Sequence, residues 1–156
     1  VIAIDMMLLE DEVPDLLDQY GSSVDYVVDA IDTVSTKLVL ASECERREVP
    51  LISAMGAARK MHPELLEFTD IYKTKNCPLC KAVRTQARKR GICHLEVLSS
   101  PEQPLEEPTT QLAGGEVTSA RTDRPARAPL GTLSFFPPIM GQMIAGHVIK
   151  RLVGLE

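Results

Sequence analysis

Hydrophobic and polar residues alternate along the chain in blocks that predict strands and helices in turn. Three apolar runs have the length of strands, at 1–5, 24–30 and 50–55. A short acidic helix is predicted over 10–20, and a second helix over 33–48 ends before Pro50. The run at 24–30 has the continuous apolar character of a strand buried on both faces. Strands and helices alternating at these lengths indicate a parallel α/β fold.

The pattern changes after the third strand. A basic loop at 56–63 leads to a predicted strand at 64–72, a helix at 77–91 that Gly91 closes, and a further strand at 94–100. Residues 101–129 contain five prolines and little periodic hydrophobicity, which is typical of a long loop or a disordered insertion. Residues 130–156 predict a final strand and an apolar helix from about 138 to 153.

We therefore expect one domain made of residues 1–100 and 130–156, with 101–129 as an insertion. The predicted fold class is α/β, in which a Rossmann-like half of a parallel sheet is followed by additional strands and helices in three layers. The chain begins at Val1 inside an apolar run, so we expect it to be a fragment of a longer protein. No apolar stretch has the length of a membrane-spanning helix.

Charge is distributed unevenly along the chain. Residues 1–50 carry twelve acidic and three basic side chains, whereas residues 51–100 carry nine basic and four acidic ones. The basic residues gather on the predicted helix after Pro78, at Lys81, Arg84, Arg88, Lys89 and Arg90. Arg84 and Arg88 are one turn apart and should project together. Such a stripe suits RNA phosphates, although a solvated helix face is the alternative.

Two acids follow the predicted strand at 24–30, in the string "YVVDAID". A strand end in an open α/β sheet is where ligands bind, and carboxylates there can hold Mg²⁺ while nucleotide phosphates supply further oxygens. The alternative is that Asp29 only solvates the strand end and Asp32 only caps the following helix.

Four cysteines are too few and too unevenly spaced for a disulfide scaffold, which favours a reducing compartment. Cys77 and Cys80 form a CxxC motif, and with Cys93 and His94 they offer ligand atoms for tetrahedral zinc. The pair could also be redox-active, because Cys77 lies at a helix start. The third interpretation, inert core thiols, follows from the apolar helical face that Cys80 shares with Val83 and Ala87.

Several strings occur in an order that resembles a known family. They are "YVVDAIDTVSTKLVL", "PLISAMGAARKMHPELLEFTDIYKTKNCPLCKAVRTQARKRGI", "VLSSPEQP" and "LGTLSFFPPIMGQMIAGHVIKRLVG". Together they resemble the carboxyl-terminal half of the ThiF/MoeB/HesA adenylating family, which is similar to ubiquitin-activating enzymes. Within it, the closest similarity is to the tRNA threonylcarbamoyladenosine dehydratases.

The resemblance implies ATP and Mg²⁺ as cofactors and tRNA as substrate. It implies nucleotide-binding roles for Asp29, Asp32, Lys37 and Gly56, with Asp32 at the ATP–Mg²⁺ site, and it assigns no catalytic residue. It also implies a homodimer. Bacterial relatives are cytoplasmic, whereas fungal ones associate with the mitochondrial outer membrane.

The chain departs from the family pattern in three places. No G-x-G-x-x-G occurs, so the phosphate-binding loop is expected upstream of Val1. His62 and Glu64 stand in place of an Asp-Pro-Thr string, and Cys77 stands in place of the Asp in Asp-Pro-Leu. Two alternative functions remain open: activation of a sulfur-carrier or ubiquitin-like protein, which the missing second CxxC pair disfavours, and a non-catalytic α/β interaction module.

Overall fold

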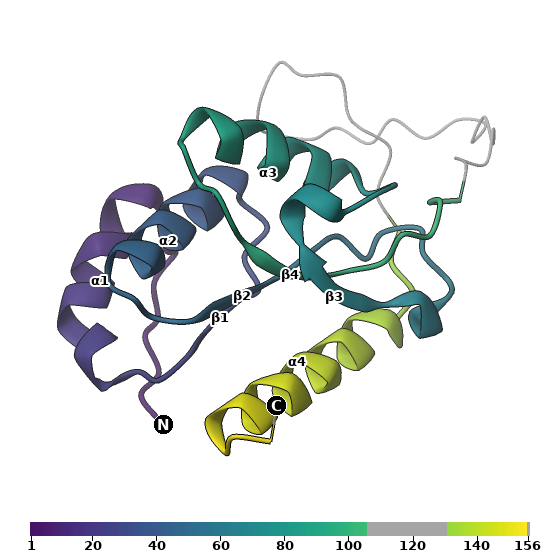
Figure 1. Ribbon diagram of the computed structural model, residues 1–156. Coiled ribbons are helices and arrows are strands. Elements are labelled where there is room, and N and C mark those ends of the chain that lie inside the picture. The colour runs from purple at the N-terminus through teal and green to yellow at the C-terminus, as the bar shows by residue number, and fades with distance from the viewer. Residues whose placement is uncertain (106–130, 156) are drawn as a thin grey trace.

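The computed structural model describes residues 1–105 and 131–155. They form three layers, in which a four-stranded sheet lies between helices on its two faces (Figure 1). The strands are β1 (Val27–Asp29), β2 (Leu51–Ala54), β3 (Glu67–Asp70) and β4 (Glu96–Ser99). The helices are α1 (Val13–Tyr20), α2 (Val34–Arg46), α3 (Pro78–Lys89) and α4 (Phe136–Leu152). Single 3₁₀ turns occur at η1 (Glu10–Glu12), η2 (Gly21–Ser23), η3 (Pro63–Leu65) and η4 (Ile71–Lys73).

The strand order is β1-β2-β4-β3, and only β3 runs antiparallel to its neighbour. Val28 lies opposite Ile52 in the first parallel pair, and Ser53 lies opposite Val97 in the second. Three parallel strands therefore bring their carboxyl ends to one edge of the sheet. Helices α1, α2 and α3 lie on one face and α4 lies on the other (Figure 1). This confirms the predicted Rossmann-like, three-layer fold class.

The alternation of side chains along the strands divides the core into separate clusters. Ile52 and Leu98 face α4, where they pack with Phe136, Met140 and Ile144. On the other face, Val97 packs with residues of α2 and α3, namely Leu38, Ala41, Cys80, Val83 and Ala87. A third cluster joins α1 to α2 through Val13, Leu17, Leu40 and Cys44. The predicted apolar face of α3 is therefore confirmed.

Helix α4 is attached to the sheet by polar contacts as well as apolar ones. Glu96 on β4 accepts hydrogen bonds from Arg151 (2.9 Å) and from the Tyr26 hydroxyl (3.2 Å). The ring of His147 lies 3.2 Å from the same carboxylate through Nε2 and stacks on Phe68 at 4.2 Å between centroids. Three distant parts of the chain thus meet at one carboxylate.

Three predictions about strands differ from the structure. Residues 1–5 form no strand, and Val1 and Ile2 are exposed. Residues 131–135 form no strand either, and lead directly into α4. Strand β1 is shorter than predicted and is not buried on both faces, since Val28 is 49% exposed. These three predictions rested on apolar composition alone. Strand β1 is partly exposed because it lies at the edge of the sheet within the described part of the chain.

The predicted insertion at 101–129 lies mostly outside the described residues, which end at 105 and resume at 131. Across those described ranges, no helix has both the length and the hydropathy needed to cross a membrane.

Candidate functional site at the carboxyl edge of the sheet

Polar side chains gather where the parallel strands end. Asp29 closes β1, Ser53 lies near the end of β2, and Ser99 closes β4. All three are buried. Because open α/β sheets bind ligands beyond the carboxyl ends of their strands, this edge is the candidate site.

A buried ion pair joins α2 to this edge. The Lys37 ammonium lies 2.8 Å from Oδ2 of Asp29, and both side chains are 0% exposed. Lys37 also donates to Ser53 Oγ (3.1 Å) and to the carbonyl of Ala54 (3.0 Å). Ser53 in turn donates to Asp29, whose Oδ1 accepts the backbone N–H of Ile31 at 2.8 Å. Every donor of the ammonium group therefore has an acceptor inside the protein.

This network defines what Asp29 and Lys37 do in the described structure. Asp29 is 1% exposed, so it does not merely solvate the end of its strand. The two predicted nucleotide-binding side chains are brought together, but they bind each other. Their observed role is to fix the end of β1 against the start of α2 and the end of β2.

Asp32 is in a different environment from Asp29. Its side chain is exposed and has no hydrogen-bond partner within the described ranges. The N-cap of α2 is Thr33, and no side chain caps that end of the helix. The helix-cap interpretation of Asp32 is therefore wrong in this structure. A solvent-facing carboxylate beside a helix start fits the ligand chemistry of Mg²⁺, which keeps waters and phosphate oxygens as its other ligands.

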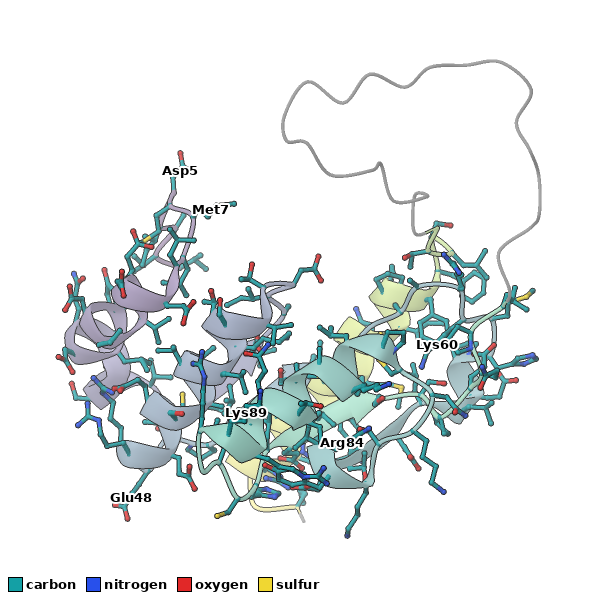
Figure 2. The ribbon with its side chains drawn as sticks, turned by 90° about the horizontal axis from the view of Figure 1, so that it is seen from above. Asp5, Met7, Glu48, Lys60, Arg84 and Lys89 are labelled. Atoms are coloured by element: carbon teal, nitrogen blue, oxygen red, sulfur yellow. The ribbon has the colours of Figure 1, made fainter. Side chains whose placement is uncertain are left out.

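Gly56 lies in the loop after β2, against the start of α3. A Cβ at this position would lie 3.4 Å from Cys77 Sγ and 3.6 Å from Leu79 Cβ. Lys60, from the same loop, is buried and donates to the carbonyl of Ser100, which follows β4. Figure 2 shows Lys60 at the end of the molecule away from α1. The loop is thus bound between two strand ends, and Gly56 permits its close approach to α3.

The departures from the family pattern at His62 and Glu64 are both on the surface. His62 Nδ1 lies 2.8 Å from Glu64 Oε1, and this hydrogen bond raises the pKa of His62 above its ordinary value. The backbone N–H groups of Met61 and His62 donate to the carboxylate of Glu102 at 2.9–3.1 Å. These contacts hold the loop and do not face the network around Asp29.

The cysteines do not assemble into a zinc centre. Cys77 and Cys80 are buried at the start of α3, whereas Cys93 and His94 are exposed near the start of β4. His94 Nδ1 pairs with Asp70 at 2.5 Å. Among the residues that the structure describes, no three His, Cys, Asp or Glu side chains are placed to hold a metal ion.

The predicted basic stripe on α3 divides into two kinds of residue. Arg84 is half-buried and donates to Thr74 Oγ1 (2.7 Å) and to the carbonyl of Thr74 (3.0 Å), so it holds η4 against α3. Arg88 lies over the ring of Tyr72, with its guanidinium carbon 5.3 Å from the centroid. The side chains of Lys81 and Lys89 are exposed and border an open hollow along α3. Arg90 borders the same hollow, but its guanidinium lies 3.4 Å from the carboxylate of Glu10. Figure 2 labels Arg84 and Lys89 on this helix.

Sequence reasoning missed the buried serines of this edge. Ser53 completes the network of Lys37, and Ser99 lies 3.4 Å from Cys80 Sγ. The signal that could have found them was a serine beside apolar residues in each of two strand strings, "LISA" and "EVLS".

The three-layer fold, with polar side chains at the carboxyl edge of its sheet, belongs to the Rossmann-like class of α/β folds. A model of the ThiF family matches residues 1–156, and the chain therefore belongs to the ThiF family. It is 38% identical over 156 residues to the tRNA threonylcarbamoyladenosine dehydratase of Bacillus subtilis (strain 168), covering 98% of this chain and 59% of that relative. The chain thus spans less than two thirds of the relative's length.

Two solved structures of an Escherichia coli protein are similar to this chain. Its tRNA N6-threonylcarbamoyladenosine dehydratase in complex with AMP matches with a TM-score of 0.74 and 21% identity, over 97% of this chain and 56% of that one. The same enzyme in complex with ATP matches with a TM-score of 0.56 and 29% identity, over 65% of this chain and 44% of that one. The first likeness establishes the fold.

Removing the ammonium group of Lys37 should strongly destabilise the protein. Lys37→Met leaves the Asp29 carboxylate buried without its counter-ion, which we expect to lower the free energy of unfolding by about 3–5 kcal/mol in urea titrations. The exposed Lys75→Met serves as the matched control and should change it by less than about 0.5 kcal/mol. Adding Asp29→Asn to Lys37→Met should recover about half of the loss. A Lys37→Met protein as stable as the control would contradict this role.

Substitutions of Arg84 and Lys89 should differ in their effect on the free energy of unfolding. Arg84→Met leaves the buried carbonyl and hydroxyl of Thr74 without their donor, and we expect a loss of about 1–3 kcal/mol in the free energy of unfolding. Lys89→Met, on the exposed side of α3, should be close to neutral. Equal effects of the two substitutions would show that Arg84 is not structural.

Proposed function

We propose that this chain is part of an ATP-dependent tRNA threonylcarbamoyladenosine dehydratase. The observation that carries the proposal is the 38% identity to the Bacillus subtilis enzyme of that name over nearly the whole chain. In the proposed reaction, ATP activates the carboxylate of threonylcarbamoyladenosine in tRNA as an acyl-adenylate. The activated carboxyl group then cyclises with loss of AMP.

Asp32 is the residue of this chain that we assign to the ATP–Mg²⁺ site. Its carboxylate is exposed three residues after the end of β1, and no described side chain forms a hydrogen bond with it. When bound, Mg²⁺ offsets negative charge on the phosphates and on the departing pyrophosphate. Asp32 would supply an anionic oxygen to that ion.

Asp29 and Lys37 act on this site as positioning residues. Their ion pair fixes the end of β1, and the N–H of Ile31, directly before Asp32, is held by the Asp29 carboxylate. The backbone that carries Asp32 is thereby set before the nucleotide binds. Gly56, whose place in the loop brings the chain close to α3, completes the proposed nucleotide edge.

The exposed basic residues of α3 are proposed to contact tRNA phosphates. Lys81, Lys89 and Arg90 lie along one open surface, and their charges can neutralise phosphates without reading sequence. Arg84 is set apart from this group because its guanidinium is bound to Thr74, whereas the contact of Arg90 with Glu10 is on the surface. The resemblance to tRNA-modifying enzymes further leads us to propose a cytoplasmic homodimer.

Asp32→Asn should abolish adenylation without affecting the fold. In the complete enzyme, the amide removes a negative oxygen from the proposed Mg²⁺ site, so ATP–pyrophosphate exchange should fall by at least about 100-fold. The thermal melt should be unchanged, because Asp32 forms no hydrogen bond within the described residues. The control is Asp25→Asn, an identical change on an exposed residue before the amino end of β1. Retained exchange in Asp32→Asn would overturn its assignment.

The basic surface of α3 predicts salt-dependent binding of tRNA. Replacing Lys81 and Lys89 together by Gln should weaken binding and lower the slope of log affinity against log salt by about 1 for each phosphate that is no longer neutralised. Lys150→Gln, which removes an exposed charge from α4 on the opposite side of the sheet, is the control and should leave the slope unchanged. Filter binding at several salt concentrations measures the affinity and its salt dependence for each variant. An unchanged slope in the double variant would place the tRNA elsewhere.

A further inference from the structure

Cys77 and Cys80 lie together at the start of α3, in a part of the site that the proposed adenylation does not use. Cys77 is the N-cap of this helix, and its sulfur accepts the backbone N–H of Cys80 at 3.4 Å. Gly56 lies against the same sulfur, since a Cβ at this glycine would be 3.4 Å from Cys77 Sγ. A CxxC pair whose first cysteine caps a helix is the arrangement of dithiols that exchange disulfides.

The surroundings of the two sulfurs are unequal. The hydrogen bond from the Cys80 thiol, the N–H groups of Cys80 and Gly56, and the ammonium of Lys60 all stabilise a thiolate at Cys77. They hold the pKa of Cys77 well below its ordinary value in spite of burial, whereas the hydrogen bond to Cys77 and burial raise the pKa of Cys80. These contacts therefore favour the thiolate at Cys77 over the thiolate at Cys80.

The exposed fraction is also larger for Cys77 than for Cys80. Cys77 is 6% exposed, while Cys80 is 1% exposed and lies against Ser99 at 3.4 Å. Cys77 is therefore the less deeply buried of the two cysteines. The other buried cysteine provides a contrast, because burial and the nearby charge of Asp29 raise the pKa of Cys44 to about 11. Cys44 thus has the environment of an inert core thiol.

We propose that Cys77 and Cys80 form a thiol–disulfide exchange site that takes small disulfide oxidants of the glutathione disulfide type. The Cys77 thiolate attacks one sulfur of the oxidant, a mixed disulfide forms, and one glutathione thiolate leaves. That thiolate takes the proton of Cys80, and the Cys80 sulfur attacks the sulfur of Cys77. The Cys77–Cys80 bond forms and the second glutathione leaves as a thiolate, so two protein sulfurs are oxidised and one disulfide is reduced.

Oxidation would change the candidate nucleotide edge, because Gly56, in the loop after β2, lies against the Cys77 sulfur. The exchange chemistry itself does not depend on the proposed dehydratase activity. It is testable on this chain alone, so its failure and that of the proposed function are distinguishable.

The test is to incubate the protein in glutathione buffers of increasing oxidised fraction, quench with acid, and map the cysteines by mass spectrometry. Wild-type protein should lose two hydrogen atoms and yield a peptide with a Cys77–Cys80 disulfide. Cys80→Ser should accumulate a glutathione adduct on Cys77, because no second thiol displaces it, and Cys77→Ser should yield neither product. Cys93→Ser, which removes an exposed cysteine, is the control and should still form the disulfide. Thermal melts verify that each variant is folded.

Alkylation of the folded wild-type protein gives an independent measurement. An ordinary thiol below its pKa reacts about tenfold faster with iodoacetamide for each pH unit of increase. The alkylation rate of Cys77 should change by less than about twofold between about pH 6 and 8, since its surroundings lower its pKa to about 5. Either of two results would overturn the proposal. The first is a glutathione adduct on Cys93 but none on Cys77 in the Cys80→Ser protein. The second is a tenfold increase in the rate of Cys77 alkylation for each pH unit.

Discussion

The buried ion pair between Lys37 and Asp29 is the constraint on which the candidate site depends. Two opposite charges with no exposed surface are tolerated only because each is neutralised and fully hydrogen-bonded. Their contacts with Ser53 and Ala54 join one helix and two strands at a single point. The same network is the reason that Asp32, three residues after Asp29, faces solvent from a fixed backbone while Asp29 does not.

The sequence predicted those elements in which a hydrophobic period and a stop signal agree. The spacing of Cys80, Val83 and Ala87 predicted the buried face of α3, and Gly91, which ends the segment with a φ of +74°, marks the position where the chain leaves the helix. Apolar composition without a regular spacing of the apolar residues predicted strands that the structure does not contain. The run at 1–5 is as apolar as β2, but within the described structure it has no strand beside it, and a strand requires a partner for its backbone groups.

The chemistry of individual side chains was less predictable than the fold, because partners are set by tertiary contacts. The sequence marks Asp29, Lys37 and Arg84 as charged residues in functional positions. It does not show that Asp29 and Lys37 bind each other or that Arg84 donates to Thr74. It also leaves the CxxC motif open between three interpretations, and it does not show that Cys77 is the N-cap of α3 and accepts the N–H of Cys80.

The way α4 is attached has a consequence for the order of folding. Thirty-six residues separate the end of β4 from the start of α4, so docking this helix joins parts of the chain that are distant in sequence and should follow formation of the sheet. Until it docks, Ile52 and Leu98 present an apolar surface to water, and Glu96 lacks Arg151. The interval between sheet formation and helix docking is therefore the stage at which newly made chains are most prone to aggregate.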